Sequence, residues 1–300
     1  MNIRKIYSKE FEEYHSNLFD FDEFIKWIQR PLRKSIRVNS IKITPDELFE
    51  KLGWKYERIP WVKSGSLNGF FVDEKYGLGA TIEHALGHYY IQEASSMMSV
   101  CALGVSDGDT VLDLCAAPGS NTTQIGELNL SGTIVANDSN RKRIKSLVAN
   151  LGRIGIMNCI VTNNDGSGFH EIKHIKGKFD KVLVDAPCSE VGTARKNIDA
   201  LKIWTPGQVK RLSVLQKKLI TSGFECLKPG GVMVYSTCTT SIEENEEVVK
   251  FLLENFENAK TEKISPDMRY DSCYEVDAAR VYPWHNDTEC AFIAKIKKEI

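Results

Sequence analysis

Two cysteines, Cys188 and Cys238, each follow a run of apolar residues. The first lies in "VLVDAPCSEVG" and the second in "VMVYSTCTT", so a small polar cluster replaces the apolar pattern at both places. A short apolar run of this kind predicts a buried strand. Cysteines inside such runs are usually small core residues, which is the expectation for Cys101, Cys115, Cys159 and Cys226. Cys188 and Cys238 lie where the pattern has stopped, and their thiols are therefore candidates for covalent chemistry.

Paired thiols at one substrate suit the methylation of a pyrimidine ring at carbon 5. That carbon is a poor nucleophile in cytosine and uracil, but addition of a thiolate at carbon 6 makes an enamine that can attack a sulfonium methyl group. An acid near ring nitrogen 3 stabilises the adduct, and a base removes the proton from carbon 5 before the thiol leaves. The residue types alone do not tell which thiol is the nucleophile.

A doubly wound α/β sheet is expected to position the two thiols, because strand patterns alternate with helical patterns from about residue 91 onward. The apolar runs have no polar face, as parallel strands covered by helices require. The predicted strands span residues 110–114, 133–138, 159–163, 179–186 and 231–237, with closing strands near 258–264 and 289–297. The strands before Cys188 and Cys238 are expected to be neighbours about 4.8 Å apart, which places the thiols within roughly 10 Å of each other.

Capping signals mark the helices around the cysteines. The long helix between them begins with Thr205 as N-cap and Pro206 at its first position. Ser241, with Glu244 three residues later, predicts a capping box for the helix after Cys238.

Residues 1–90 read as a small α+β region, separate from the sheet domain of residues 91–300. A helix is predicted around 22–29, and strands around 35–43 and 68–73. Thr44 and Glu47 predict a capping box for a further helix, which Gly53 ends.

The loop after the first strand of the sheet, "DLCAAPGSNT", predicts a nucleoside-binding site. A turn with a glycine, followed about twenty residues later by an acid such as Asp138, suits a ligand with ribose hydroxyls. The dinucleotide fingerprint G-x-G-x-x-G is absent, so S-adenosylmethionine fits better than NAD, and an NAD-linked oxidoreductase is disfavoured. Asp138 is also compatible with a helix N-cap, and for Asp165 a plain turn aspartate competes evenly with an adenine contact. The predicted cofactor-binding residues are Cys115, Ala116, Ala117, Pro118, Gly119, Ser120, Asn121, Asp138, Arg143, Asp165 and Asp185.

Composition restricts the setting in which this chemistry takes place. The 300 residues carry a net charge of −1, which argues against a protein that coats nucleic acid through bulk charge. No run of about 18 apolar residues is long enough to span a membrane, and no signal peptide precedes the first helix, so a cytoplasmic protein is expected. The eight cysteines are expected to be reduced, and without any C-x-x-C pair no metal site is expected. A monomer is expected.

The segment of residues 26–42, "KWIQRPLRKSIRVNSIK", is basic and contains no acid. A solvated helix and strand face is one interpretation, and contact with phosphates is the other. Its basic residues are Lys26, Arg30, Arg33, Lys34, Arg37 and Lys42.

Three motifs together resemble one enzyme family. "DLCAAPGSNT", "DAPCSEVGTARKNID" and "YSTCTTSIEENE" are similar to the cofactor loop and the two cysteine motifs of the Nol/Nop/Sun family of S-adenosylmethionine-dependent RNA cytosine-5 methyltransferases. "IRVNSIK", "YYIQEASSMM" and "RVYPWHNDTECAFIAKI" also resemble family segments, so the likeness spans about residues 33–297.

The resemblance implies a role for each residue of the pair. Cys238 would be the nucleophile, and Cys188 would assist proton removal and release of the product. Asp185 would hold the cytosine edge near ring nitrogen 3 and exocyclic nitrogen 4. It also implies a class I methyltransferase (Rossmann-like) domain, an RNA-recognition-like amino-terminal region, and tRNA or rRNA as the partner. The predicted RNA-binding residues are Lys26, Arg30, Arg33, Lys34, Arg37, Arg195 and Lys196.

Several positions depart from the family pattern, two of them in the cofactor loop. Ser120 and Asn121 replace the usual Gly-Lys, Glu190 replaces a glycine, and Ile198 stands where proline is common; "ECAF" replaces Asp-Gly-Phe-Phe. An altered loop also fits a second hypothesis, in which a catalytically weak RNA-binding assembly factor retains the methyltransferase fold.

Overall fold

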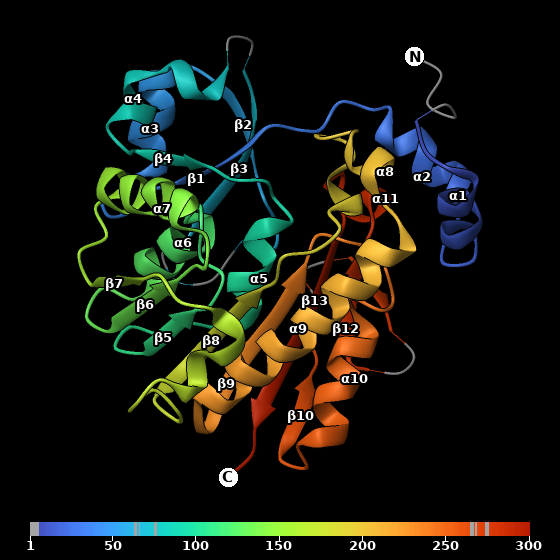
Figure 1. The fold of residues 1–300 in the computed structure, drawn as a ribbon. Coiled ribbons are helices and arrows are strands. Elements are labelled where there is room, and N and C mark those ends of the chain that lie inside the picture. Colours follow the sequence, from blue (N-terminus) through green and yellow to red (C-terminus); the bar gives the residue numbers. More distant parts are fainter. Residues whose placement is uncertain are drawn as a thin grey trace.

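A large sheet with helices on both faces forms most of the molecule (Figure 1). The computed structural model describes residues 6–62, 65, 67–74, 77–264, 267, 269–273 and 276–300. The nine strands of this sheet within those residues are β5 (Thr110–Asp113), β6 (Thr133–Asn137), β7 (Cys159–Thr162), β8 (Phe179–Asp185), β9 (Leu227–Thr237), β10 (Ala259–Glu262), β11 (Asp271–Ser272), β12 (Ala278–Val281) and β13 (Ala291–Lys298). The expected doubly wound α/β architecture is confirmed.

Five parallel strands lie in the order β7-β6-β5-β8-β9, and β13 continues the sheet antiparallel to β9. The first half of β13 pairs with β12 and its second half with β10. The carboxyl ends of β5, β8 and β9 therefore meet in the middle of the sheet, where open α/β sheets bind their ligands. β9 begins at Leu227 rather than at the predicted residue 231, because Leu227 already pairs with Phe179 before a register shift.

Alternate residues of the central strands enter two different cores. Val111, Leu183 and Val234 pack on one face of the sheet with α5, α6 and α7. Leu112, Val184 and Tyr235 pack on the other face with α9 and α10. This burial on both faces explains why the strands read as continuous apolar runs. The helices are α5 (Ser96–Leu103), α6 (Ser120–Leu128), α7 (Arg141–Ile154), α9 (Pro206–Cys226) and α10 (Glu246–Asn255).

The capping prediction is confirmed for α9 and is wrong for α10. Thr205 accepts a hydrogen bond from the Gln208 amide, and Pro206 opens α9. Helix α10 begins only at Glu246, and Ser241 does not cap it. Glu244 lies before the first residue of the helix, and its carboxylate accepts hydrogen bonds from the amide and hydroxyl of Ser189 in the Cys188 loop.

A second, antiparallel sheet lies at one side of the main sheet, above α6 and α7 in Figure 1. Its strand order is β2-β3-β1-β4, with β1 (Ser35–Val38), β2 (Lys55–Arg58), β3 (Asn68–Asp73) and β4 (Tyr89–Ile91). Helix α3 (Pro45–Leu52) packs on it, and the predicted capping box of Thr44 and Glu47 is confirmed. Gly53, with φ of 62°, ends the helix as predicted. A short helix, α4 (Ile82–Ala85), precedes β4.

The first two helices do not pack on this small sheet. Helices α1 (Lys9–Ser16) and α2 (Phe21–Ile28) lie at the opposite side of the molecule, beside α8 (Ala200–Ile203) and α11 (Pro283–Asn286) (Figure 1). Phe11, Phe21 and Phe24 share a buried cluster with side chains of the later chain, among them Trp204 and Tyr282. We propose that the chain divides near residue 90 into two domains along the sequence. In space, α1 and α2 pack against the second domain.

Candidate active site

The two cysteines come together at the carboxyl ends of β8 and β9. These strands are parallel neighbours, and Asp185 of β8 lies opposite Ser236 of β9. The Sγ atoms of Cys188 and Cys238 are 3.2 Å apart. The expectation that neighbouring strands bring both thiols to one place is therefore confirmed.

The Cys238 thiol is held in its protonated form. The hydrogen bond with Cys188 raises the pKa of the Cys238 thiol well above its usual range, and burial raises it further. Only the thiolate is nucleophilic, so Cys238 must lose its proton before it can react.

The reactivity of Cys238 is expected to depend steeply on pH. Because its pKa is raised, the thiolate fraction at pH 7 is small, and alkylation by iodoacetamide should speed up about tenfold per pH unit between pH 7 and 9. Replacing Cys188 with alanine removes the largest cause of the raised pKa and should accelerate alkylation of Cys238 at pH 7. Mass spectrometry of the Cys238 peptide measures both rates. A rate that does not change between pH 7 and 9 would contradict the prediction.

Asp185 lies beside the thiols, and both of its oxygens are engaged. Ser236 Oγ donates to Oδ1 at 2.8 Å, and Asn121 Nδ2 donates to Oδ2 at 2.9 Å. Burial raises the pKa of the Asp185 carboxyl, while these two hydrogen bonds act in the opposite direction. The group therefore faces the site in a fixed orientation and takes up a proton more readily than an exposed aspartate.

A cavity of about 870 Å³ opens above these residues. Its wall includes Cys188, Cys238 and Asp185 together with the loop between β5 and α6. All of the predicted cofactor-binding residues except Gly119 line it: Cys115, Ala116, Ala117, Pro118, Ser120, Asn121, Asp138, Arg143, Asp165 and Asp185. Gly119 shapes the loop instead, because its φ is 105° and a Cβ there would lie 2.9 Å from Leu147 Cδ1.

Asp138 is buried under the cofactor loop. Its carboxylate accepts hydrogen bonds from the amides of Ala117 at 3.1 Å and Asn140 at 2.7 Å, and the Arg143 guanidinium lies 3.7 Å away. The N-cap of α7 is Asn140 and not Asp138. Asp165 caps a short 3-10 turn by accepting from the Ser167 amide at 2.9 Å, and it also lines the cavity, so both interpretations of that residue remain.

The chemistry of the cavity fits S-adenosylmethionine. The carboxyl groups of Asp138, Asp165 and Asp185 are among the six that line it. Carboxylates can accept hydrogen bonds from ribose hydroxyls, and their negative field favours a cationic sulfonium ligand over a pyrophosphate. The volume is at the upper end of the range for small-ligand sites, about 300–1,000 Å³.

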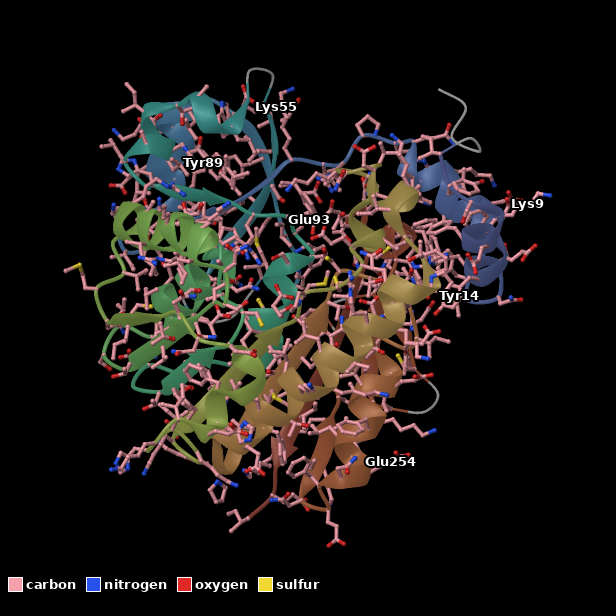
Figure 2. The ribbon with its side chains drawn as sticks, in the orientation of Figure 1. Lys9, Tyr14, Lys55, Tyr89, Glu93 and Glu254 are labelled. Atoms are coloured by element: carbon pink, nitrogen blue, oxygen red, sulfur yellow. The ribbon has the colours of Figure 1, made fainter. Side chains whose placement is uncertain are left out.

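The sequence reasoning missed several polar residues of the cavity, including Gln92, Glu93 and Glu289. Gln92 and Glu93 lie in the quoted segment "YYIQEASSMM", but nothing in their spacing identifies them as cavity residues. Figure 2 shows Glu93 between the small sheet and the side of the molecule that carries α1. Burial and the neighbouring Glu93 raise the pKa of Glu289 to about 8.

Two predicted RNA-binding residues are buried, and for them the prediction is wrong. The Arg37 side chain is 0% exposed and forms an ion pair with Glu127 of α6 at 3.0 Å. It also donates to Ser120 O at 3.1 Å and to Thr123 Oγ1 at 2.8 Å. The Arg195 side chain is 1% exposed and donates to the carbonyls of Pro31 and Thr288 and to Asp287. Both guanidiniums join distant parts of the chain and are not available to phosphates.

The other predicted RNA-binding residues lie near the surface. Lys26 and Arg30 are exposed on or just after α2, and Arg30 stacks over the Trp27 ring at 4.1 Å. Arg33 and Lys34 are engaged in ion pairs with Glu57 at 2.5 Å and Glu74 at 3.3 Å. Lys196 lines the cavity.

Neither a metal centre nor a membrane span emerges from the described part of the chain. No group of three or more metal-ligating side chains lies together among the described residues. None of the helices described is long and apolar enough to traverse a bilayer.

Comparison with known proteins gives one consistent result. Residues 100–297 match the family described as 16S rRNA methyltransferase RsmB/F, and residues 5–94 match the N-terminal domain of 16S rRNA methyltransferase RsmF. The chain is 44% identical over 291 residues to ribosomal RNA small subunit methyltransferase F of Vibrio campbellii, covering 93% of this chain but 60% of that protein.

A relative of similar length is equally informative. The chain is 42% identical over 313 residues to a tRNA (cytosine(49)-C(5))-methyltransferase of Pyrococcus abyssi, covering 99% of this chain and 97% of the relative. The solved structure of a methyltransferase homolog protein from Pyrococcus horikoshii superposes with a TM-score of 0.85 at 33% identity, covering 99% and 97% of the two chains. The chain therefore belongs to the 16S rRNA methyltransferase RsmB/F family, within the Nol/Nop/Sun group that its cysteine motifs resemble.

Proposed function

We propose that this protein transfers a methyl group from S-adenosylmethionine to carbon 5 of cytosine in RNA, through a covalent adduct on Cys238. The observation that carries the proposal is the pair of thiols 3.2 Å apart on the wall of a cavity that also holds Asp185 and the cofactor loop. The substrate is tRNA or rRNA, since relatives named for each are 42% and 44% identical to this chain.

Three residues have separate roles in the proposed reaction. Cys238 loses its proton and adds to carbon 6 of the cytosine, so that a carbon–sulfur bond forms and carbon 5 becomes nucleophilic. Asp185, whose pKa is raised by burial, provides a proton or hydrogen bond at ring nitrogen 3. Once carbon 5 carries the methyl group, Cys188 assists removal of the proton from that carbon. The bond between Cys238 and carbon 6 then breaks, and the methylated product leaves.

The cofactor loop and the acids after the strands would hold S-adenosylmethionine. When bound, it supplies an electrophilic methyl group on a sulfonium. The carboxylate of Asp138, already fixed by the amides of Ala117 and Asn140, would accept from the ribose hydroxyls. Ala116 to Pro118 form the wall against which the ligand would lie.

RNA would approach across the face that carries the cavity. Lys26 and Arg30 at one side and Lys196 within the cavity are proposed to contact the phosphate backbone. Such contacts position the RNA without reading its sequence.

A direct assay tests the proposal. The full chain is incubated with S-adenosylmethionine and unmodified tRNA or rRNA, and bisulfite sequencing then locates any 5-methylcytosine. Methylation of a defined cytosine is the expected result. RNA binding without methylation, together with no calorimetric binding of S-adenosylmethionine at millimolar concentration, would favour the assembly-factor hypothesis.

Replacing Asp138 with alanine is expected to weaken S-adenosylmethionine binding about 10- to 100-fold, because hydrogen bonds to a charged group are worth about 1.5–3 kcal/mol. Isothermal titration calorimetry measures the change. Asp180→Ala is the control, since this carboxylate pairs with Lys228 at 2.8 Å and does not line the cavity. Equal weakening by both substitutions would contradict the proposed role of Asp138.

A further inference from the structure

A buried carboxylate lies beneath the loop that carries Cys188. Glu244 is 0% exposed and lies between Cys238 and the start of α10. Its Oε2 accepts from the Ser189 amide at 3.0 Å and from Gln216 Nε2 at 2.9 Å, and its Oε1 accepts from Ser189 Oγ at 2.5 Å. Gln216 also donates to Pro187 O at 2.8 Å. The residues on both sides of Cys188 are thus linked to Glu244 by hydrogen bonds: Ser189 directly, and Pro187 through the side-chain amide of Gln216.

The same carboxylate reaches the loop that carries Cys238. Thr239 Oγ1 and Ser189 Oγ are 2.7 Å apart, so the Thr239 hydroxyl can donate to Ser189, whose own proton goes to Glu244. Asn245, which follows Glu244 in the chain, donates to Thr239 O at 3.0 Å and accepts from Thr237 Oγ1 at 2.6 Å. The residues on both sides of Cys238 are therefore fixed by the same short segment.

We propose that Glu244 is a positioning residue that sets the distance between the Cys188 and Cys238 thiols. It does not line the cavity, so it acts through the two loops and not on the substrate. Misplacing a reacting group by about 1 Å can cost about 100-fold in rate. The expected effect of Glu244 on catalysis rests on the proposed function. Its effect on the distance between the two thiols does not.

The directions of the hydrogen bonds predict which substitutions are tolerated. In Glu244→Gln, the amide oxygen can still accept from the Ser189 amide and from Gln216. The new NH2 group can donate to Ser189 Oγ, which then donates to Thr239 in the reverse direction. In Glu244→Ala, these buried donors lose their acceptor, and the two loops lose their common support.

The experiment compares three full-length variants with the wild-type protein: Glu244→Ala, Glu244→Gln and Leu252→Ala. Leu252 is buried in α10 and does not line the cavity, so it controls for a general loss of stability. Two rates are measured: methyl transfer at saturating substrates, and formation of the Cys188–Cys238 disulfide with diamide, which takes up the two thiol hydrogens. Mass spectrometry of the joined peptides follows the second rate.

Glu244→Ala is expected to lower both rates at least tenfold, and its turnover about 100-fold. Glu244→Gln should stay within about tenfold of wild type, and Leu252→Ala should change neither rate below its melting temperature. Affinity for S-adenosylmethionine should remain unchanged in all three.

If Glu244→Ala does not fold, Ser189→Ala replaces it, because loss of that hydroxyl breaks the path to Thr239 and should slow disulfide formation several-fold. Wild-type disulfide rates in Glu244→Ala, or in Ser189→Ala as its replacement, would overturn the inference. If the wild-type protein transfers no methyl group, the proposed function is wrong. The inference about Glu244 can still be tested, because the diamide rate reports the spacing of the two thiols.

Discussion

Replacing Cys238 with alanine is expected to abolish methyl transfer to RNA, with a loss of at least about 10⁴-fold. The reason is that carbon 5 of cytosine stays unreactive unless sulfur adds at carbon 6, and removal of a covalent nucleophile costs this much or more in other enzymes. Incorporation of a labelled methyl group from S-adenosylmethionine into RNA measures the loss. The variant should still bind the cofactor, because the loop from Cys115 to Asn121 and Asp138 are untouched.

Cys188→Ala is the matched control, and it should fail at a different step. Without the second thiol the carbon 5 proton is not removed, so the bond between Cys238 and carbon 6 persists. The RNA is expected to remain attached to the protein through sodium dodecyl sulfate electrophoresis, whereas Cys238→Ala should show no such band. Wild-type turnover in either variant, or a stable adduct in Cys238→Ala, would show that the two roles are wrongly assigned.

Replacing Arg37 with alanine is expected to destabilise the fold by about 3–5 kcal/mol, because it removes one partner of the buried ion pair between Arg37 and Glu127. At about 2–4 °C per kcal/mol, the melting temperature should fall by about 10 °C. Thermal unfolding followed by circular dichroism measures the change. Arg37 also binds Ser120 O at the start of α6, so weaker cofactor binding should accompany the loss of stability.

Arg33→Ala provides the comparison. Its ion pair with Glu57 has side chains 34% and 65% exposed, and an exposed pair of this kind contributes about 0–1 kcal/mol. Its melting temperature should therefore stay close to that of the wild type. A normal melting temperature for Arg37→Ala, combined with weaker RNA binding, would restore the interpretation of Arg37 as a phosphate contact.

The sheet was predictable because its signals are local. Strands covered on both faces read as apolar runs, and β5 to β9 lie where those runs indicate. Thr44 and Thr205 identify helix starts for the same reason, since a cap and its partner are only three residues apart. The packing of α1 and α2 was not predictable, because their aromatic residues contact Trp204 and Tyr282, far along the chain.

The site was predictable only in part, for a related reason. Asp185 ends β8, and Cys188 and Cys238 follow β8 and β9, which are paired neighbours, so the meeting of these residues follows from the fold. The burial of Arg37 depends on Glu127, which no local pattern connects to it. The spacing of Ser241 and Glu244 fits a capping box, but Glu244 supports the loops of Cys188 and Cys238. The sequence could not distinguish the two, because a carboxylate can accept hydrogen bonds in either arrangement.

The separation of α1 and α2 from the small sheet has an evolutionary consequence. Tyr14 of α1, labelled in Figure 2, donates a hydrogen bond to Glu243 and accepts one from the Ile242 amide, close in sequence to Cys238. The amino-terminal segment thus contacts the larger sheet domain at two separate places, first through this helix pair and then through Arg37 of β1. Recombination at residue 90 could not exchange the amino-terminal segment by itself. A segment from another protein would also need aromatic residues that pack against Trp204 and Tyr282 of this chain. The two parts of the chain are therefore expected to diversify together.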